Sequence, residues 1–147
     1  MKKATAIVIG SGMGVTNDTM EIVRFVLANS TVPVVVDADA INCIAKDIEI
    51  LVNRNCDVII TPHPGEMARL LNCDAQAIND NRIIVAEKFA EKYGITIVLK
   101  GAGTLISDRI NTAANHTGNA GMAKGGSGEN LIEGGPPPWE CRLLACH

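Results

Sequence analysis

Residues 32–39 read Val-Pro-Val-Val-Val-Asp-Ala-Asp, a β-branched run that follows a proline turn signal and ends at two aspartates. An uninterrupted apolar strand of this kind is typical of a parallel sheet that is covered on both faces. The same pattern, a short apolar run closed by glycines or polar residues, recurs elsewhere in the chain. The other runs are Ala4–Ile9, Asp57–Ile60 and Ile95–Leu99.

Segments with helical spacing of apolar residues separate these runs. They cover about residues 20–27 with an N-cap at Thr16 or Asn17, residues 40–51, residues 64–71, and residues 75–93 with Gly94 as the stop. A strand pair over Thr104–Ser107 and Ile110–Thr112 follows the last of the buried runs. Strands alternating with helices predict an α/β fold with a mostly parallel sheet, right-handed crossovers and helices on both faces.

Composition excludes several classes of protein. The chain has 147 residues, 47% of them hydrophobic, with a net charge of −3. High apolar content and small net charge argue against intrinsic disorder, and the length suits one domain. Apolar runs of four to seven residues are too short to span a membrane. A mildly acidic chain with scattered cations argues against binding to nucleic acid.

Four unusual loops follow the predicted strands, and in an open α/β sheet that carboxyl edge is where ligands bind. Glycine-rich loops let backbone N–H groups converge on an anion, so a phosphate is the natural guest. A carboxylate beyond such a nest can accept a proton from a hydroxyl that attacks phosphorus. The loops are Gly10–Gly14, His63–Glu66, Lys100–Thr104 and Gly125–Glu129.

Each loop residue also has an ordinary structural interpretation. Gly10–Gly14 could be a plain turn, and His63 between two prolines could be a helix cap. Lys100 and Glu129 could be solvated surface charges. Asp37 and Asp39 could cap the helix that follows them or contact a ligand. The occurrence of all these loops at one predicted sheet edge favours a site.

Four strings in this order resemble those of the NAD(P)H-hydrate dehydratase family, which has a ribokinase-like three-layer sandwich fold. The resemblance covers about residues 4–130. It implies repair of hydrated NADH and NADPH, in which ADP or ATP, with Mg²⁺, phosphorylates the added hydroxyl and phosphate is then eliminated. It also implies, for the intact family, a homo-oligomer. The five cysteines, an odd number without metal-site spacing, favour reduced thiols and hence a cytoplasmic location. The strings are Val36–Asn42, Ile60–Glu66, Leu99–Thr104 and Gly118–Gly128.

The resemblance also assigns site residues by position. Hydrated NAD(P)H would be held by Gly14 or Gly12, by His63 and by Glu129, and Glu129 stands where the family has its general base. Glu66 resembles the acidic residue that ribokinase-like enzymes place near Mg²⁺ and phosphates. The adenine nucleotide would contact Lys100, Gly101, Ala102, Gly103, Thr104 and Gly128, with Gly125, Gly126, Ser127 and Gly128 as the anion hole.

The chain departs from the family pattern in three respects. Glu129 replaces the family's Asp, and the added methylene displaces the carboxylate. Residues 130–138 end in three prolines, which break the helix that the family has there. The family's opening βα segment and closing helices are also missing. We therefore expect a partial domain over residues 1–130 and an aberrant or disordered tail over residues 131–147. A ribokinase-like small-molecule kinase and an inactive nucleotide-binding fragment are the alternatives.

Overall fold

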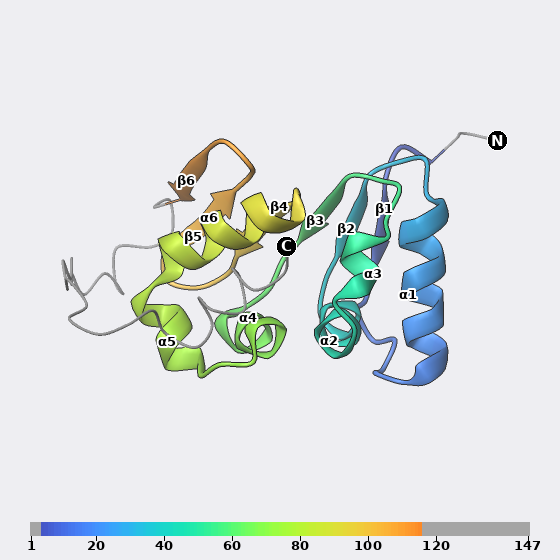
Figure 1. The fold of residues 1–147 in the computed structure, drawn as a ribbon, viewed down its shortest axis with the longest axis horizontal. Helices are drawn as coiled ribbons and strands as arrows, with labels where there is room; N and C mark the ends of the chain where they lie inside the picture. Colours follow the sequence, from blue (N-terminus) through green and yellow to red (C-terminus); the bar gives the residue numbers. More distant parts are fainter. Residues whose placement is uncertain (1–3, 116–147) are drawn as a thin grey trace.

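The computed structural model describes residues 4–115 and shows one six-stranded sheet whose strands lie in sequence order, β1-β2-β3-β4-β5-β6 (Figure 1). The strands are β1 (Ile7–Ile9), β2 (Val34–Val36), β3 (Val58–Ile60), β4 (Thr96–Leu99), β5 (Thr104–Ser107) and β6 (Thr112–Asn115). The helices are α1 (Asn17–Asn29), α2 (Asp39–Lys46), α3 (Glu49–Val52), α4 (Pro64–Leu71), α5 (Ala75–Asp80) and α6 (Arg82–Tyr93).

Strands β1 to β4 are parallel, and β4, β5 and β6 form an antiparallel meander. The α/β class and the mostly parallel sheet are therefore confirmed. The second hairpin strand lies later than expected, over Thr112–Asn115 rather than Ile110–Thr112. The carboxylate of Asp108 accepts the N–H groups of Ile110 and Asn111, each at 2.7 Å, so these residues form the turn.

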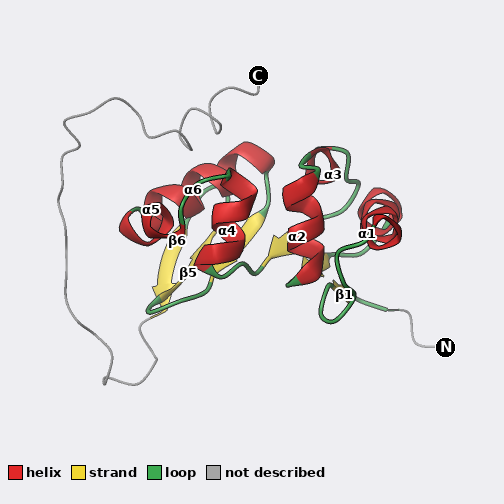
Figure 2. Ribbon diagram, turned by 90° about the horizontal axis from the view of Figure 1, so that it is seen from below, coloured by secondary structure: helices red, strands yellow, loops and turns green. Residues whose placement is uncertain are grey.

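The helices α1 to α6 pack beside one another along the sheet (Figure 2). Right-handed crossovers between strands in sequence order stack their helices on the same side. The burial of the strand residues shows the same one-sided cover. Val34 and Val36 of β2 are fully buried. Val8 of β1 and Ile106 of β5, whose side chains point to the other face of the sheet, are 72% and 43% exposed. The prediction placed helices on both faces, and residues 4–115 supply the layer on one face.

Helix boundaries follow local capping. Thr16 caps α1, its side chain accepting the N–H of Thr19, and Gly94 ends α6 in the left-handed conformation, as expected. The expected helix over residues 40–51 is divided at Asp47, whose carboxylate accepts the N–H of Glu49. The expected helix over residues 75–93 is divided at Asn81, whose side-chain amide donates to the carbonyl of Ala77. Short polar side chains that bond to nearby backbone interrupt helices in this way.

The core lies between the helical layer and the covered face of the sheet. Its largest fully buried side chains include Phe89 of α6, Leu27 of α1, Met67 of α4 and Ile97 of β4. Because these side chains come from both layers, the core fixes the helices over the strands, and the carboxyl ends of β1 to β4 therefore lie along one edge of the sheet.

Candidate functional site

The loops that follow β1 to β4 meet at the carboxyl edge of the sheet, as the sequence predicts. Hydrogen bonds join them in pairs. The N–H of Gly14 donates to Oδ2 of Asp39 at 2.8 Å, which ties the first loop to the second. The N–H of Lys100 donates to the carbonyl of Pro62 at 2.8 Å, which ties the fourth loop to the third.

Asp37 stands at the centre of this edge. Its Oδ1 accepts a hydrogen bond from Nζ of Lys100 at 2.8 Å and another from Oγ1 of Thr61 at 2.7 Å. These bonds, that of Lys100 first, hold the pKa of Asp37 below its ordinary value. Three loops therefore share one carboxylate, and the ammonium group of Lys100 is held at a fixed point while its side chain stays 44% exposed.

The glycine loop 10–14 depends on close backbone packing at its first residue. Gly10 has φ of 129°, and a Cβ at this position would lie 1.7 Å from the carbonyl oxygen of Asp37. Gly12 and Gly14, each with φ of 72°, have open space around them. The loop is therefore anchored under the edge at Gly10 and presents its later glycines to the surface, since both are exposed.

The interpretation of Asp37 and Asp39 as helix caps is wrong. Ala38 is the N-cap of α2, and no side chain makes the capping bond there. The two carboxylates instead hold neighbouring loops together. Ala38 lies between them with φ of 47°, a conformation that costs a non-glycine residue about 1–3 kcal/mol. The packing of the loops holds this strained backbone at the centre of the edge.

His63 is the N-cap of α4, with Pro64 at the first helical position. Its Nδ1 accepts the N–H groups of Gly65 and Glu66, at 3.0 and 3.2 Å, so in this geometry any ring hydrogen is carried by Nε2. Oε2 of the buried Glu66 accepts the N–H of His63 at 2.8 Å, and Oε1 lies 3.5 Å from Nε2. Both carboxylate oxygens of Glu66 thus face His63, whose ring remains half exposed at the edge.

Arg82 is a feature of this edge that the sequence analysis missed. It is the first residue of α6, and its guanidinium donates to the carbonyls of the fourth loop. Nη1 donates to Ala102 at 2.7 Å. Nη2 donates to Gly103 at 3.0 Å, to Leu99 at 3.1 Å and to Lys100 at 3.4 Å. The sequence does hold a hint of this role. The helix dipole disfavours a cation at a helix N-terminus, so an arginine at the first position of α6 indicates that its side chain bonds elsewhere.

The remaining predicted residues, Gly125, Gly126, Ser127, Gly128 and Glu129, lie outside the described residues, as does the tail over residues 131–147. Within residues 4–115 no group of three His, Cys, Asp or Glu side chains is placed to hold a metal ion, and no helix there is long and apolar enough to cross a membrane.

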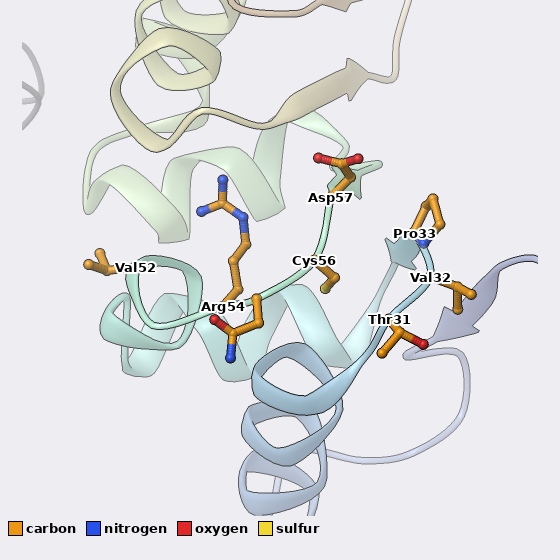
Figure 3. A pocket seen from close by; sticks show the side chains of 8 residues that line it. Thr31, Val32, Pro33, Val52, Arg54, Cys56 and Asp57 are labelled. Carbon is orange, nitrogen blue, oxygen red and sulfur yellow. The ribbon is translucent and has the colours of Figure 1, made fainter.

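A pocket is present at the opposite edge, where β2 and β3 begin (Figure 3). Pro33, Arg54, Cys56 and Asp57 are among the residues that line it, and they come from the segments that lead into these two strands. None of the predicted site residues lines this pocket. The carboxyl edge, where the predicted loops and their mutual bonds lie, is therefore the candidate site.

The family model of NAD(P)H-hydrate dehydratase matches residues 1–132. The chain belongs to this family. The chain is 39% identical over 132 residues to a bifunctional NAD(P)H-hydrate repair enzyme of Moorella thermoacetica, covering 89% of this chain and 25% of that protein. It is 38% identical to the ADP-dependent (S)-NAD(P)H-hydrate dehydratase of Neisseria meningitidis, covering 84% of this chain and 43% of the relative.

A solved structure of the same family supports the ribokinase-like fold. The ADP/ATP-dependent NAD(P)H-hydrate dehydratase of Bacillus subtilis, co-crystallised with ATP and Mg²⁺, matches with a TM-score of 0.66 and 32% identity. The match covers 78% of this chain and 40% of that one. This member of the dehydratase family thus spans less than half the length of the relatives described here. The predicted family and fold are confirmed.

Proposed function

We propose that this chain carries out the nucleotide-dependent dehydration of hydrated NADH and NADPH, with the carboxyl edge of the sheet as its site. The observation that carries the proposal is the meeting of three loops at two carboxylates, in a chain of the dehydratase family: loop 10–14 is bonded to Asp39, and loops 61–66 and 100–104 are bonded to Asp37. Family strings that lie far apart in the sequence are joined there by hydrogen bonds. We further propose a family domain over residues 1–130, a cytoplasmic location and assembly into a homo-oligomer.

The fourth loop is suited to an adenine nucleotide. Lys100 has a part-exposed side chain whose ammonium group Asp37 holds in place. Gly101 and Gly103 adopt positive φ, which glycine tolerates, and without side chains they leave the backbone open to an approaching ligand. We assign Lys100, Gly101, Ala102, Gly103 and Thr104 to the nucleotide. The proposal extends to Gly125, Gly126, Ser127 and Gly128 as donors to its phosphates.

The first and third loops are assigned to the damaged cofactor. Gly12 and Gly14 are exposed, so their backbone can approach a ribose or a nicotinamide ring closely. The side chain of His63 is half exposed, so its ring can contact the substrate, while its Nε2 lies 3.5 Å from Oε1 of Glu66. Since Glu66 faces His63 with both oxygens, we assign it to the orientation of this ring rather than to Mg²⁺.

The chemistry of the proposal is phosphoryl transfer followed by elimination. The hydroxyl oxygen on the hydrated ring attacks the terminal phosphorus of ATP or ADP, and the bond from that phosphorus to the bridging oxygen breaks. Glu129 would accept the hydroxyl proton. The ring nitrogen's lone pair then helps to expel phosphate, and loss of the neighbouring proton restores the dihydronicotinamide. Mg²⁺ bound with the nucleotide would neutralise phosphate charge.

Incubation of the purified chain with hydrated NADH, Mg²⁺ and either ATP or ADP tests the proposal. We expect the absorbance of intact dihydronicotinamide to return at a rate proportional to protein concentration. A parallel assay measures protection against thermal unfolding by each nucleotide. A stable phosphorylated product without recovery of absorbance would indicate a kinase instead. Protection without any turnover would indicate an inactive nucleotide-binding fragment.

A further inference from the structure

Arg82 makes contacts that are unusual for an arginine at a helix N-terminus. Within the described residues its two terminal nitrogens donate to four main-chain carbonyls, all in the segment 99–103. Burial lowers the pKa of Arg82, so the guanidinium is held at a cost in hydration. A rigid, planar fork of donors can span several carbonyls at once, which a lysine ammonium cannot do.

These contacts fix the direction of the peptide N–H groups in the loop. A trans peptide is planar, so its C=O and N–H point in opposite directions. The first peptide of the segment shows this directly: the Leu99 carbonyl accepts from Arg82, while the N–H of Lys100 donates to Pro62 on the other side at 2.8 Å. By the same geometry, the N–H groups of Gly101 and Gly103 face away from the guanidinium, while Thr104 already belongs to β5 and pairs with Asn115 of β6.

Gly101 shows how closely the loop is moulded to the arginine. A Cβ at Gly101 would lie 2.8 Å from Nη1 and 3.0 Å from Nη2 of Arg82, and its φ is 141°. Any side chain at position 101 would therefore force either the loop or the guanidinium to move. The glycine and the arginine together set the path of the loop.

We propose that Arg82 is a positioning residue for nucleotide binding. It holds four carbonyls of the segment 99–103 on one side of the loop and so presents the N–H groups of Gly101 and Gly103 to the nucleotide on the other. The inference rests on the proposed function, because it takes this loop as the nucleotide-binding segment. It adds a residue on α6, outside the loop, on which nucleotide affinity depends.

Arg54 provides a matched control from the same chain. Like Arg82, it is partly buried and donates to main-chain carbonyls, those of Leu51 at 2.6 Å and Gly94 at 2.8 Å. In both arginines Nε is buried and has no hydrogen-bond partner among the described residues. Arg54 lies at the opposite edge of the sheet, in the pocket of Figure 3. Replacing it removes a similar set of bonds without touching the candidate site.

The experiment compares wild type, Arg82→Lys, Arg82→Met and Arg54→Met in the full chain. Titration calorimetry measures the Kd for ATP with Mg²⁺. Amide hydrogen exchange without nucleotide measures the protection of the Lys100 amide, which donates to the carbonyl of Pro62. We expect Arg82→Met to weaken ATP binding by about tenfold or more, equivalent to the loss of one well-placed hydrogen bond. We expect Arg82→Lys to restore little of the affinity, and Arg54→Met to stay within about twofold of wild type.

Faster exchange of the Lys100 amide in both Arg82 variants, but not in Arg54→Met, would support the inference even if Arg82→Met is too unstable to titrate. Wild-type affinity in Arg82→Lys with unchanged exchange would overturn it and leave the proposed function standing. Equal weakening by Arg54→Met would also overturn it, because the effect would then be one of general stability. Absence of ATP binding by the wild type would overturn the proposed function, and this inference with it.

Discussion

Replacing Asp37 removes the carboxylate that joins three loops of the candidate site. Asp37→Asn keeps an oxygen for the hydroxyl of Thr61 but loses the charge that faces Lys100. The carboxylate is 30% exposed and Lys100 is 44% exposed, so solvent screens the pair. We therefore expect a loss of about 1 kcal/mol, and about 2 kcal/mol for Asp37→Ala, which removes both bonds. The midpoints of thermal unfolding should fall by about 3 and 6 °C.

The effect depends on pH in a defined direction. The pKa of Asp37 is lowered in the folded chain, chiefly by its hydrogen bond with Lys100. The carboxylate therefore contributes its stabilisation fully above the ordinary aspartate pKa of about 3.9. This contribution is lost as the pH falls through the lower pKa of the folded state, where the folded chain takes up the proton. The difference between wild type and Asp37→Asn should thus be present at neutral pH and shrink in acid.

Urea unfolding at neutral and acidic pH measures both effects. Asp57→Asn serves as the control, because Asp57 is an exposed carboxylate at the opposite edge of the sheet. We expect this variant to unfold like wild type at both pH values. A difference between wild type and Asp37→Asn that stays constant from neutral to acidic pH would refute the assignment of the stabilisation to the charge of Asp37.

Other substitutions test the packing of the edge and the core. Gly10→Ala should lower the free energy of unfolding by roughly 3 kcal/mol, because the new Cβ would clash with the carbonyl oxygen of Asp37. Gly12→Ala should cost only about 1 kcal/mol, because its Cβ would meet no other atom and only the positive φ is strained. Chemical denaturation of both variants measures the difference. Phe89→Ala should cost about 3–5 kcal/mol, because the ring is fully buried, while Phe25→Ala, at 68% exposure, should unfold like wild type. Glu66→Ala should lower the free energy of unfolding by about 1 kcal/mol, because the N–H of His63 loses its acceptor. Glu66→Gln should lose much less, since its amide oxygen can accept the same hydrogen bond. Equal losses in the two variants would contradict the capping role of Glu66.

The sequence predicts the strands well where burial and β-branching agree, as in Val34–Val36 and Val58–Ile60. It is less successful where one polar side chain decides the local structure. Asp47 and Asn81 each divide a segment whose apolar spacing predicts one continuous helix. Periodicity reports only which face is buried, and the bond of a short polar side chain to nearby backbone is invisible to it.

The candidate site was predictable as a set of loops but not in its internal bonds. Glycine-rich and polar strings after parallel strands predict one shared edge. The structure places the loops 10–14, 63–66 and 100–104 there, and the predicted loop 125–129 lies outside the described residues. The role of Asp37 as the partner of Lys100 depends on two residues far apart in the sequence that a sheet register brings together. The contacts of Arg82 could not be predicted, because it bonds to main-chain carbonyls, which every residue has whatever its side chain.

The sequential order of the strands has a consequence for how this chain folds during synthesis. Each strand from β2 to β6 pairs with the strand made just before it, so no later strand has to be inserted between two that are already paired. The sheet of residues 4–115 can therefore grow from its first edge as the chain leaves the ribosome, with the helix of each crossover made before the next strand arrives. On such a route the loops of the carboxyl edge are completed in turn, and Lys100 is the last of them to reach Asp37.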